Sequence, residues 1–545
     1  MQTFYASDFG VQDGKDVSLQ LDELFHTIRQ TAGEKALVFS RGTYYISREN
    51  RKPIHAHITN TAGKREYRAP NEPAVHRFAL HLDGIDDLTI EGGGAQFIMR
   101  GPMTNLAVTH CRNLMIRGLT LDTADPNLHR LDVVEAGRFH VTFRAHDRDI
   151  LEKSGRFYNW VGEGYRLSTR KGAGTSWWNA SIRPGNERLI YRSDHPLAGA
   201  FSMKKVGPAL YRCRYMIPKH YEPGQRFYVF DTTRYEVGIF ADECENLCLE
   251  EISQHFNYSL AFVAQDCRDI TLRNLRFQPR PGSGLEVTSL ADFIQICMCS
   301  GRVTVEDCVF SGACDDCLNV HGIHFRAVRK KDGRILAKFR HPQTWGFNPL
   351  HAGDHLRFID PQSMLPLGKN QIRTSRLADP YTIELTVEDP SAVPDGNFVI
   401  EDADRCPDLI FRRNEVDRII TRGLLLTTSG KTVIENNHFT ATGMSGILIS
   451  DDARNWYESG FVRDVTISGN TFDFCRETPV RILPENRIHR GAVHRGIRIL
   501  NNRFRSYHGT CITAKSTDNL EIRGNDFACG DPLKTENCGN VRTDF

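Results

Sequence analysis

A short motif that recurs along the chain constrains the fold more than any other feature of the sequence. It is close to apolar-x-apolar-x-x-Asn-x-Phe, and looser copies begin near Ile270. The four clearest copies end at Phe439, Phe472, Phe504 and Phe527, at intervals of 33, 32 and 23 residues (472−439, 504−472 and 527−504). A unit this short cannot enclose a core of its own, so neighbouring units must stack into a solenoid.

The pattern inside each unit indicates which solenoid this is. Short alternating runs rich in β-branched residues are typical of strands, and an Asn just after such a run suits a sharp bend where a side-chain ladder can form. The L-x-x-L-x-L spacing of leucine-rich repeats and the 3.6-residue period of helical repeats are both missing from these units. The sequence therefore predicts an all-β chain folded as a parallel β-helix.

Residues 17–31 are expected to cover the first turn of this solenoid. Their apolar residues follow mostly one stripe of a helix, namely Leu19, Leu21, Leu24, Phe25 and Ile28. An amphipathic helix in this position would hide the open edge of the first coil. We expect residues 1–121 to contain this capping helix and the first coils.

Two long stretches interrupt the repeats, at residues 122–238 and 325–404. They share a matching fragment, Gly224–Asp231 in the first and Gly353–Asp360 in the second. Both are longer than ordinary loops. We predict two related small β-barrels inserted at solenoid loops, where insertions are tolerated. The remaining coils then occupy residues 239–324 and 405–545.

Composition excludes several classes of partner. Lys and Arg number 69 and Asp and Glu 67, for a net charge of +2, which is not the basic excess of a nucleic-acid-binding protein. No apolar run reaches the roughly 18 residues of a membrane span. Cys314 and Cys317 form a CxxC pair, but no redox helix or second pair of metal ligands accompanies them. We interpret them as packing residues.

The start of the chain, from Met1 to Gly10, lacks the basic segment and apolar run of a secretory signal. The expected location is the cytoplasm if the chain is full length. It is the periplasm or the cell exterior if a leader has been removed.

Three acidic residues are expected to gather at one point of the outer wall. Coils of a parallel β-helix lie about 4.8 Å apart, so residues one repeat apart lie one above another. Asp292 and Asp315 are 23 residues apart (315−292), and Asp316 adjoins Asp315 at a predicted bend. Asn319 and His321 follow on the same segment. Each Asp alone would be typical of a solvated bend, but three aligned by the repeat favour a site.

Such a cluster suits the hydrolysis of glycosidic bonds. One carboxylic acid must protonate the leaving oxygen, and a carboxylate must attack or activate water. Crowded carboxylates cannot all ionise cheaply, so one stays protonated near neutral pH, and the cluster titrates as a unit. Asp315, the middle residue, is the natural holder of this proton. Stacked carboxylates can also leave room for the water of an inverting reaction.

Three segments resemble a known enzyme family. Residues 305–322, with Cys-Asp-Asp-Cys-Leu-Asn-Val-His at 314–321, residues 421–428 and residues 443–460 are similar to the signatures of glycoside hydrolase family 110, the α-1,3-galactosidases. The Asp…Asp-Asp pattern also resembles that of polygalacturonases, which share the fold.

The resemblance implies a right-handed β-helix and an inverting exo-enzyme. Its substrate would be terminal α-1,3-linked galactose on blood-group-B-type or linear glycans. Asp315 would be the general acid, and Asp292 and Asp316 would share the role of base.

Other residues are candidates for sugar binding. Trp456 or Tyr457 could stack on the apolar face of galactose, while Glu458 and Arg422 could bind its hydroxyls. Asn319 could bind a hydroxyl or join an Asn ladder. His321 could contact sugar or donate to a carboxylate. Weaker candidates lie on preceding coils: Asn257, Tyr258 and Gln265.

Two other functions remain open from the residues alone. A polysaccharide lyase on this fold would use a basic residue and acid-bound Ca²⁺, whereas the site segments hold acids without an adjoining Lys or Arg. A glycan-binding solenoid without catalysis would need no stacked acids. No cofactor and no metal are expected, and a homo-oligomer is an open expectation because solenoid flanks carrying barrels often pack together.

Overall fold

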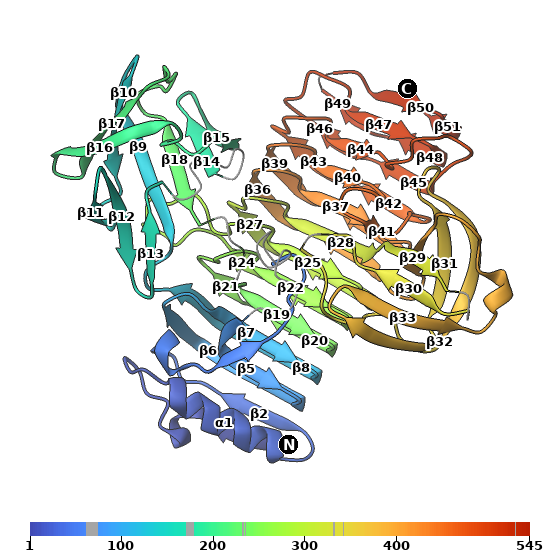
Figure 1. The fold of residues 1–545 in the computed structure, drawn as a ribbon, viewed down its shortest axis with the longest axis horizontal. Helices are drawn as coiled ribbons and strands as arrows, with labels where there is room; N and C mark the ends of the chain where they lie inside the picture. Colours follow the sequence, from blue (N-terminus) through green and yellow to red (C-terminus); the bar gives the residue numbers. More distant parts are fainter. Residues whose placement is uncertain are drawn as a thin grey trace.

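The chain folds as a right-handed β-helix with two insertions (Figure 1). The computed structural model describes residues 1–61, 75–170, 179–231, 234, 236–330, 333–341, 343–528 and 530–545. Within them, one sheet of 22 strands runs the length of the solenoid, from β1 (Gln2–Tyr5) to β51 (Gly539–Thr543). None of the described helices has the length and apolar composition needed to cross a membrane.

A second long sheet carries the coils that matter for function. Its strands are parallel except where β41 (Glu458–Ser459) and β4 (Pro53–His55) pair with their neighbours. The other strands in its order are β5 (Val75–Asp83), β7 (Thr104–Thr109), β19 (Ile239–Asp242), β22 (Phe262–Gln265), β25 (Ile294–Cys297), β28 (Leu318–Ile323), β37 (Leu424–Thr427), β40 (Ile447–Ile449), β44 (Val480–Ile482), β47 (Ile512–Lys515) and β50 (Leu533–Glu536).

The Asn and Phe of the repeated motif form two ladders inside the solenoid. The rings of Phe439, Phe472 and Phe504 stack at 5.1 Å between centroids and within 9° of parallel. In the Asn ladder, each side-chain amide donates to the next, with Asn437 to Asn470 at 2.9 Å. Its members are Asn414, Asn437, Asn470, Asn502 and Asn525. Buried amides need such partners, so the motif itself dictates how the coils align.

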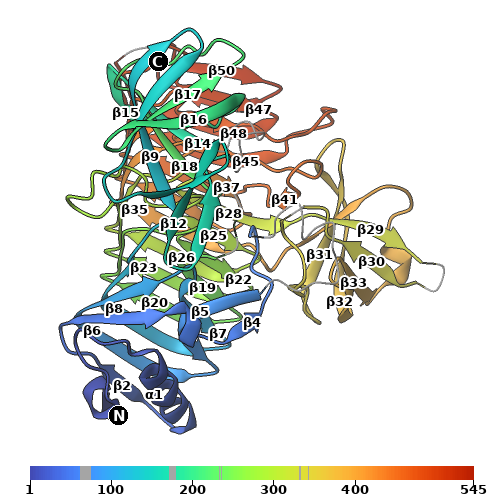
Figure 2. The ribbon, with the colours of Figure 1, turned by 60° about the vertical axis from the view of Figure 1, so that its left-hand side comes forward.

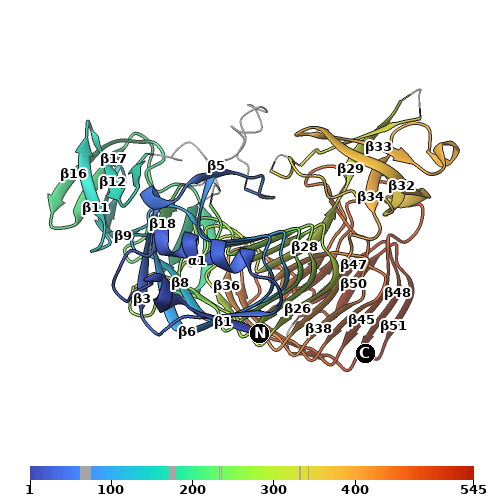
Figure 3. The same ribbon diagram turned by 90° about the horizontal axis from the view of Figure 1, so that it is seen from below.

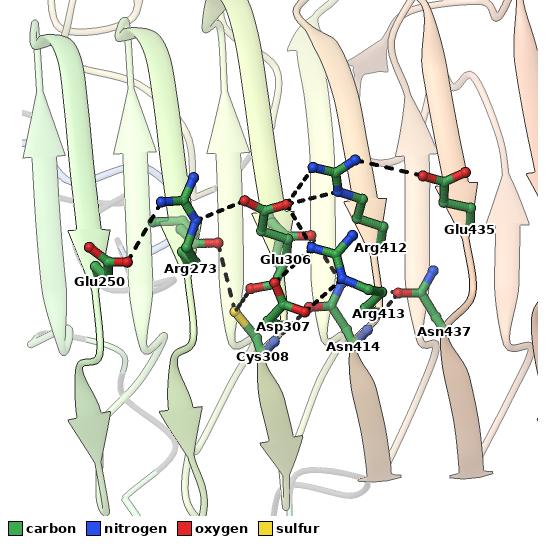
Figure 4. A network of polar contacts seen from close by, with 12 residues as sticks. Glu250, Arg273, Glu306, Asp307, Cys308, Arg412, Arg413, Asn414, Glu435 and Asn437 are labelled. Atoms are coloured by element: carbon green, nitrogen blue, oxygen red, sulfur yellow. Dashed lines mark hydrogen bonds and ion pairs between the residues drawn. The ribbon is translucent and has the colours of Figure 1, made fainter.

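A third ladder, the outer ion ladder, runs along the outside of the first sheet (Figure 4). Glu306 on β26 (Ser300–Glu306) lies between Arg273 on one coil and Arg412 on the next, at 2.8 and 2.7 Å. The Glu306 side chain is only 6% exposed. Burial alone would raise its pKa, but the hydrogen bonds from Arg273 and Arg412 lower the pKa of Glu306 below its ordinary value.

The predicted capping helix is α1 (Ser18–Gln30). It buries Leu21, Leu24, Phe25 and Ile28 against the first coil. Leu19 differs from the prediction because it points away from the core and is 65% exposed. The helix covers the N-terminal end of the solenoid (Figure 2).

The second insertion is a closed barrel, as predicted. It follows β28 directly, and the strand order around it is β29 (Phe325–Arg329), β30 (Ile335–Lys338), β33 (Thr382–Val387), β32 (Leu365–Asp379), β31 (His355–Asp360) and β34 (Val399–Asp402). The solenoid resumes with β35 (Asp408–Arg412).

The first insertion differs from a single closed barrel within the described residues. It has a three-stranded sheet of β11 (Ile150–Ser154), β12 (Phe157–Gly162) and β13 (Tyr165–Ser168). Its larger sheet has the order β15 (Asn186–Ser193), β14 (Asn179–Arg183), β18 (Arg226–Phe230), β9 (Leu128–Gly137), β10 (His140–Ala145), β17 (Leu210–Tyr215) and β16 (Ala200–Gly207).

The edge strand β15 of this larger sheet lies against the solenoid. Leu189 and Tyr191 pack against Ala441 of a solenoid coil. The shared fragments end in β18 and β31, so the two insertions present corresponding strands. They project on either side of the second sheet (Figure 3).

Candidate active site

The three acidic residues lie at the bends that lead into β25 and β28. Asp292 and Asp316 are stacked neighbours: the Phe293 amide donates to the Asp316 carbonyl, and the Asp316 amide donates to Oδ1 of Asp292, both at 2.9 Å. The predicted register, with Asp292 over Asp315, is wrong by one residue. Ile294 pairs with Leu318, a step of 24 (318−294).

Asp315 lies beside this stacked pair, and the structure brings all three carboxylates together. One oxygen of each lies within 4.8 Å of the others. Asp292 and Asp316 are 3% and 2% exposed, whereas 14% of the Asp315 side chain remains accessible. Asp315 is therefore the acid most open to a ligand.

The acids face a cavity of about 250 Å³. Its walls come from the solenoid, from both insertions and from the N-terminal region. The solenoid supplies Asp292, Asp315, Asp316, Asn319, Thr421, Arg422, Leu425, Met444, Trp456 and Glu458. The other parts of the chain supply Asn60, Arg192, Arg234, His341 and Gln343.

Two arginines hold the carboxylate of Asp315. Arg192, on the edge strand β15, lies 3.0 Å from Oδ1, and Arg234 lies 2.7 Å from Oδ2. Burial alone would raise the pKa of Asp315, but Arg192 and Arg234 outweigh it and lower that pKa. The prediction that Asp315 is the natural holder of the shared proton took no account of these two guanidinium groups, because the sequence could not reveal them.

Asp292 has the opposite electrostatic environment. Burial, reinforced by the charges of Asp315 and Asp316, raises the pKa of Asp292 well above its ordinary range. Its only side-chain donor in the described residues is Asn60, at 3.4 Å. The surroundings of Asp292 therefore favour its protonated form.

Asp316 is neutralised by Arg422 of the next coil. Nε of Arg422 donates to Oδ1 at 2.8 Å, and a terminal nitrogen lies 2.8 Å from Oδ2. The backbone amide of Arg422 adds a third bond at 3.0 Å, and the Thr421 hydroxyl a fourth. Arg422 thus reaches the cavity wall, but its guanidinium is committed to Asp316 rather than free for sugar hydroxyls. With Arg192, Arg234 and Arg422 beside the three acids, the cluster needs no cation for charge balance.

Four of the predicted sugar-binding residues line the cavity: Arg422, Asn319, Trp456 and Glu458. The amide of Asn319 donates to Oε1 of Glu458 at 3.0 Å, and its own oxygen accepts no bond from the described residues. Trp456 is half exposed and lies 5.3 Å from the ring of His341. These side chains combine polar groups with one accessible aromatic face.

His321 and Tyr457 lie close to the cavity without lining it. The ring of His321 is buried, with Nδ1 donating to the Gly322 carbonyl at 2.8 Å and Nε2 accepting from Gln295 at 2.6 Å. Tyr457 has a positive φ of 57°, and its carbonyl accepts from the amide of His324 at 2.8 Å. It shapes the loop between Trp456 and Glu458.

The three weaker candidates lie outside the cavity lining. Gln265 accepts from the Thr59 amide at 2.9 Å and donates to the His57 carbonyl at 3.0 Å, so it anchors the N-terminal segment. Tyr258 packs edge-on against Phe256 at 4.9 Å. Asn257 is buried in a β-bridge to Ser289. Cys314 and Cys317 are buried free thiols, which agrees with their interpretation as packing residues.

Sequence reasoning missed the residues that reach the site from distant parts of the chain. Arg192 and Arg234 come from the first insertion, His341 and Gln343 from the second, and Asn60 from the N-terminal region. Burial lowers the pKa of His341 to about 3, so its ring is neutral. No repeat spacing connects these residues with the acids, since only the placement of the insertions does so.

A cluster of carboxyl groups facing a pocket can supply the acid and the base that glycoside hydrolases use. Residues 398–528 match the family model of the right-handed β-helix region, and residues 334–396 match that of GLAA-B β-barrel domain II. These matches and the relatives named α-1,3-galactosidase together identify the chain as a glycoside hydrolase.

An α-1,3-galactosidase A of Bacteroides fragilis is 33% identical over 543 residues, covering 96% of this chain and 87% of that protein. The α-1,3-galactosidase A of Bacteroides thetaiotaomicron is 32% identical over 493 residues, covering 89% and 85%. The chain belongs to the family of the α-1,3-galactosidases. Among solved structures, a family 28 exopolygalacturonase of Yersinia enterocolitica matches 99% of this chain and 78% of that chain, with 11% identity and a TM-score of 0.40.

Proposed function

We propose that this chain is an exo-acting, inverting α-1,3-galactosidase. The observation that carries the proposal is the cavity of about 250 Å³ into which Asp292, Asp315 and Asp316 all face. This volume is below the roughly 300–1,000 Å³ of pockets for drug-sized ligands, and it suits a single terminal sugar. The names of the relatives supply the sugar and the linkage.

The two arginines on Asp315 give the proposed acid a way to gain its proton. Sugar hydroxyls that accept from Arg192 or Arg234 would draw these groups away from Asp315, and its pKa would rise. The proton held by Asp292 would then pass to Asp315, leaving Asp292 as a carboxylate that activates water with Asp316. Asp315 protonates the leaving oxygen, because it is the most accessible acid.

Inversion rests on the family resemblance rather than on the spacing of the acids. Inverting glycosidases usually separate their carboxyl groups by about 6.5–9.5 Å and retaining ones by about 5–5.5 Å. The oxygens of this cluster approach within 4.8 Å. With three acids, inversion remains compatible with this short spacing. Asp315 would protonate the leaving oxygen on one side of the sugar, and Asp292 and Asp316 would together hold the attacking water on the opposite side.

The test uses galactosyl disaccharides that differ only in linkage, α-1,3, α-1,4 or α-1,6. We expect release of galactose from the α-1,3 compound alone, with β-galactose as the first anomer seen by NMR. Asp315→Asn should abolish turnover while sugar binding, measured by calorimetry, persists. Release of α-galactose first would refute inversion, and full turnover by Asp315→Asn would remove the acid assignment.

A further inference from the structure

A second cluster of ionisable side chains lies away from the cavity, where the second barrel joins the solenoid. His324 follows β28, Glu401 is on β34 and Asp451 follows β40. All three are fully buried, and one candidate ligand atom from each lies within 4.8 Å of the others. Three segments that are far apart in the sequence therefore meet at a single buried point.

The polar atoms of this cluster are only partly satisfied. Nε2 of His324 lies 2.8 Å from Oδ1 of Asp451, and Arg357 donates to Oε1 of Glu401 at 2.8 Å. Nδ1 of His324, Oε2 of Glu401 and Oδ2 of Asp451 have no partner among the described residues. Buried polar atoms are rarely left so, and three in one cluster indicate a missing ligand.

Charge indicates the sign of this ligand. The carboxyl groups of Glu401 and Asp451 lie together in a fully buried site, and the Arg357 guanidinium contacts only that of Glu401. An isolated buried carboxylate is costly unless it is paired or coordinates a metal. A cation between the three side chains would complete the pairing.

We propose that His324, Glu401 and Asp451 form a structural site for one divalent transition-metal cation. An imidazole nitrogen and two carboxylate oxygens suit Zn²⁺ or Mn²⁺ better than Ca²⁺, which takes six to eight oxygens. Ligand atoms of a tetrahedral metal at about 2.1 Å lie about 3.4 Å apart. Side-chain shifts of up to about an ångström would therefore close the site.

The position of the site indicates what it stabilises. The cation would fasten the second barrel, through Glu401, to the strand that carries Asn319, through His324. Asp451 begins the loop that carries Trp456 and Glu458, and the next residue, Asp452, accepts from the amides of Arg454 and Trp456 at 2.8 and 2.7 Å. The site is thus placed to order the cavity wall from behind.

A proton on His324 is the competing way to balance the carboxylates. Burial alone would lower the pKa of His324, but Asp451 outweighs it and raises that pKa. A protonated imidazole would need no metal. Direct measurement of bound metal separates the two arrangements.

The experiment measures metal in the purified full-length chain by plasma mass spectrometry, after growth in medium supplemented with Zn²⁺ and Mn²⁺ and after dialysis against a chelator. We expect about one equivalent of Zn²⁺ or Mn²⁺ per chain. His324→Gln and Glu401→Gln should lose it. Asp292→Asn should retain it, which excludes binding at the other acid cluster.

A second measurement covers variants that fail to fold. The wild-type chain is unfolded in guanidinium with chelator and refolded with Zn²⁺, Mn²⁺, Ca²⁺ or no metal. We expect Zn²⁺ or Mn²⁺ to raise Tm by several degrees over refolding without metal, and Ca²⁺ to leave it unchanged. A native chain that contains no stoichiometric metal, or a metal content that survives in His324→Gln and Glu401→Gln, would overturn the proposal.

Discussion

Asp316 donates its backbone amide to Oδ1 of Asp292 at 2.9 Å, so the two acids are fixed by the backbone of adjacent coils. Their environments nevertheless differ, because Arg422 neutralises Asp316 whereas Asp292 is buried against like charges. The two stacked carboxyl groups therefore lie in opposite electrostatic surroundings, one paired with a guanidinium and the other crowded by like charges.

Arg192 is expected to set the basic limb of the pH profile. Its guanidinium helps to lower the pKa of Asp315, so Arg192→Met should raise that pKa and move the basic limb of kcat/KM to higher pH. Arg192→Lys keeps a charge and should shift the limb less. Arg188→Met, on the same strand and outside the cavity, is the control. An unchanged limb in Arg192→Met would show that Asp315 is not the acid whose titration limits the reaction.

Trp456 is expected to bind substrate without taking part in the chemical step. Trp456→Ala removes a half-exposed aromatic face from the cavity, which should cost about 1–2 kcal/mol, or roughly 5- to 30-fold in KM, with little change in kcat. Trp456→Phe should recover most of the loss. Phe474→Ala, an exposed ring outside the cavity, should leave KM unchanged. A fall in kcat with constant KM would contradict a stacking role.

The outer ion ladder should make stability depend on pH. Because the folded-state pKa of Glu306 is depressed, its contribution is present above the ordinary Glu pKa and is lost as pH falls through the lowered value. Glu306→Gln should therefore cost about 1–2 kcal/mol near pH 7, and the difference from wild type should shrink below about pH 4. Thermal unfolding across pH tests this, with the exposed Glu23→Gln as control. A constant difference down to pH 3 would contradict the assignment.

The Asn ladder should fail most severely at its middle. Asn470→Ala removes the acceptor of both the Asn437 amide and its side chain, each at 2.9 Å. Leaving these buried donors unpaired should cost about 1–3 kcal/mol each. Asn525→Ala, at the less buried end of the ladder, should cost clearly less. Chemical denaturation measures the free energy of unfolding of both variants. Equal losses would show that the contribution of a ladder Asn does not depend on how deeply it is buried.

Repeat spacing predicted the parts of this molecule that depend on local pattern. The Asn ladder, the capping helix and the closed second barrel were all predicted from short-range periodicity or from segment length. The acids could be brought together by the same argument, although the step of 24 residues between Ile294 and Leu318 shifted the stacking by one position. A one-residue insertion in a bend is invisible to a repeat averaged over many coils.

The arginines of Asp315 were beyond this reasoning. Arg192 is 123 residues from Asp315 and reaches it from the edge of an inserted sheet. The contact between Arg192 and Asp315 depends on how that sheet packs against the solenoid, where Tyr191 contacts Ala441. The protonation state of Asp315 therefore depends on tertiary packing, whereas the repeat spacing is enough to predict an acidic residue at this place on the solenoid wall.

The closed barrel has a consequence for the order of assembly. Leu318 pairs directly with Leu424, so two adjacent rungs are separated by 106 residues (424−318). Closing so long a segment is entropically slower than zipping the next rung of an uninterrupted array. If the barrel forms first, its two ends come close together and the effective gap becomes short. Zipping from the N-terminal coils would then pause at β28 until the barrel has formed, as it would at β7, where Leu106 pairs with Ile239 across the first insertion. Both junctions are natural boundaries between cooperative units.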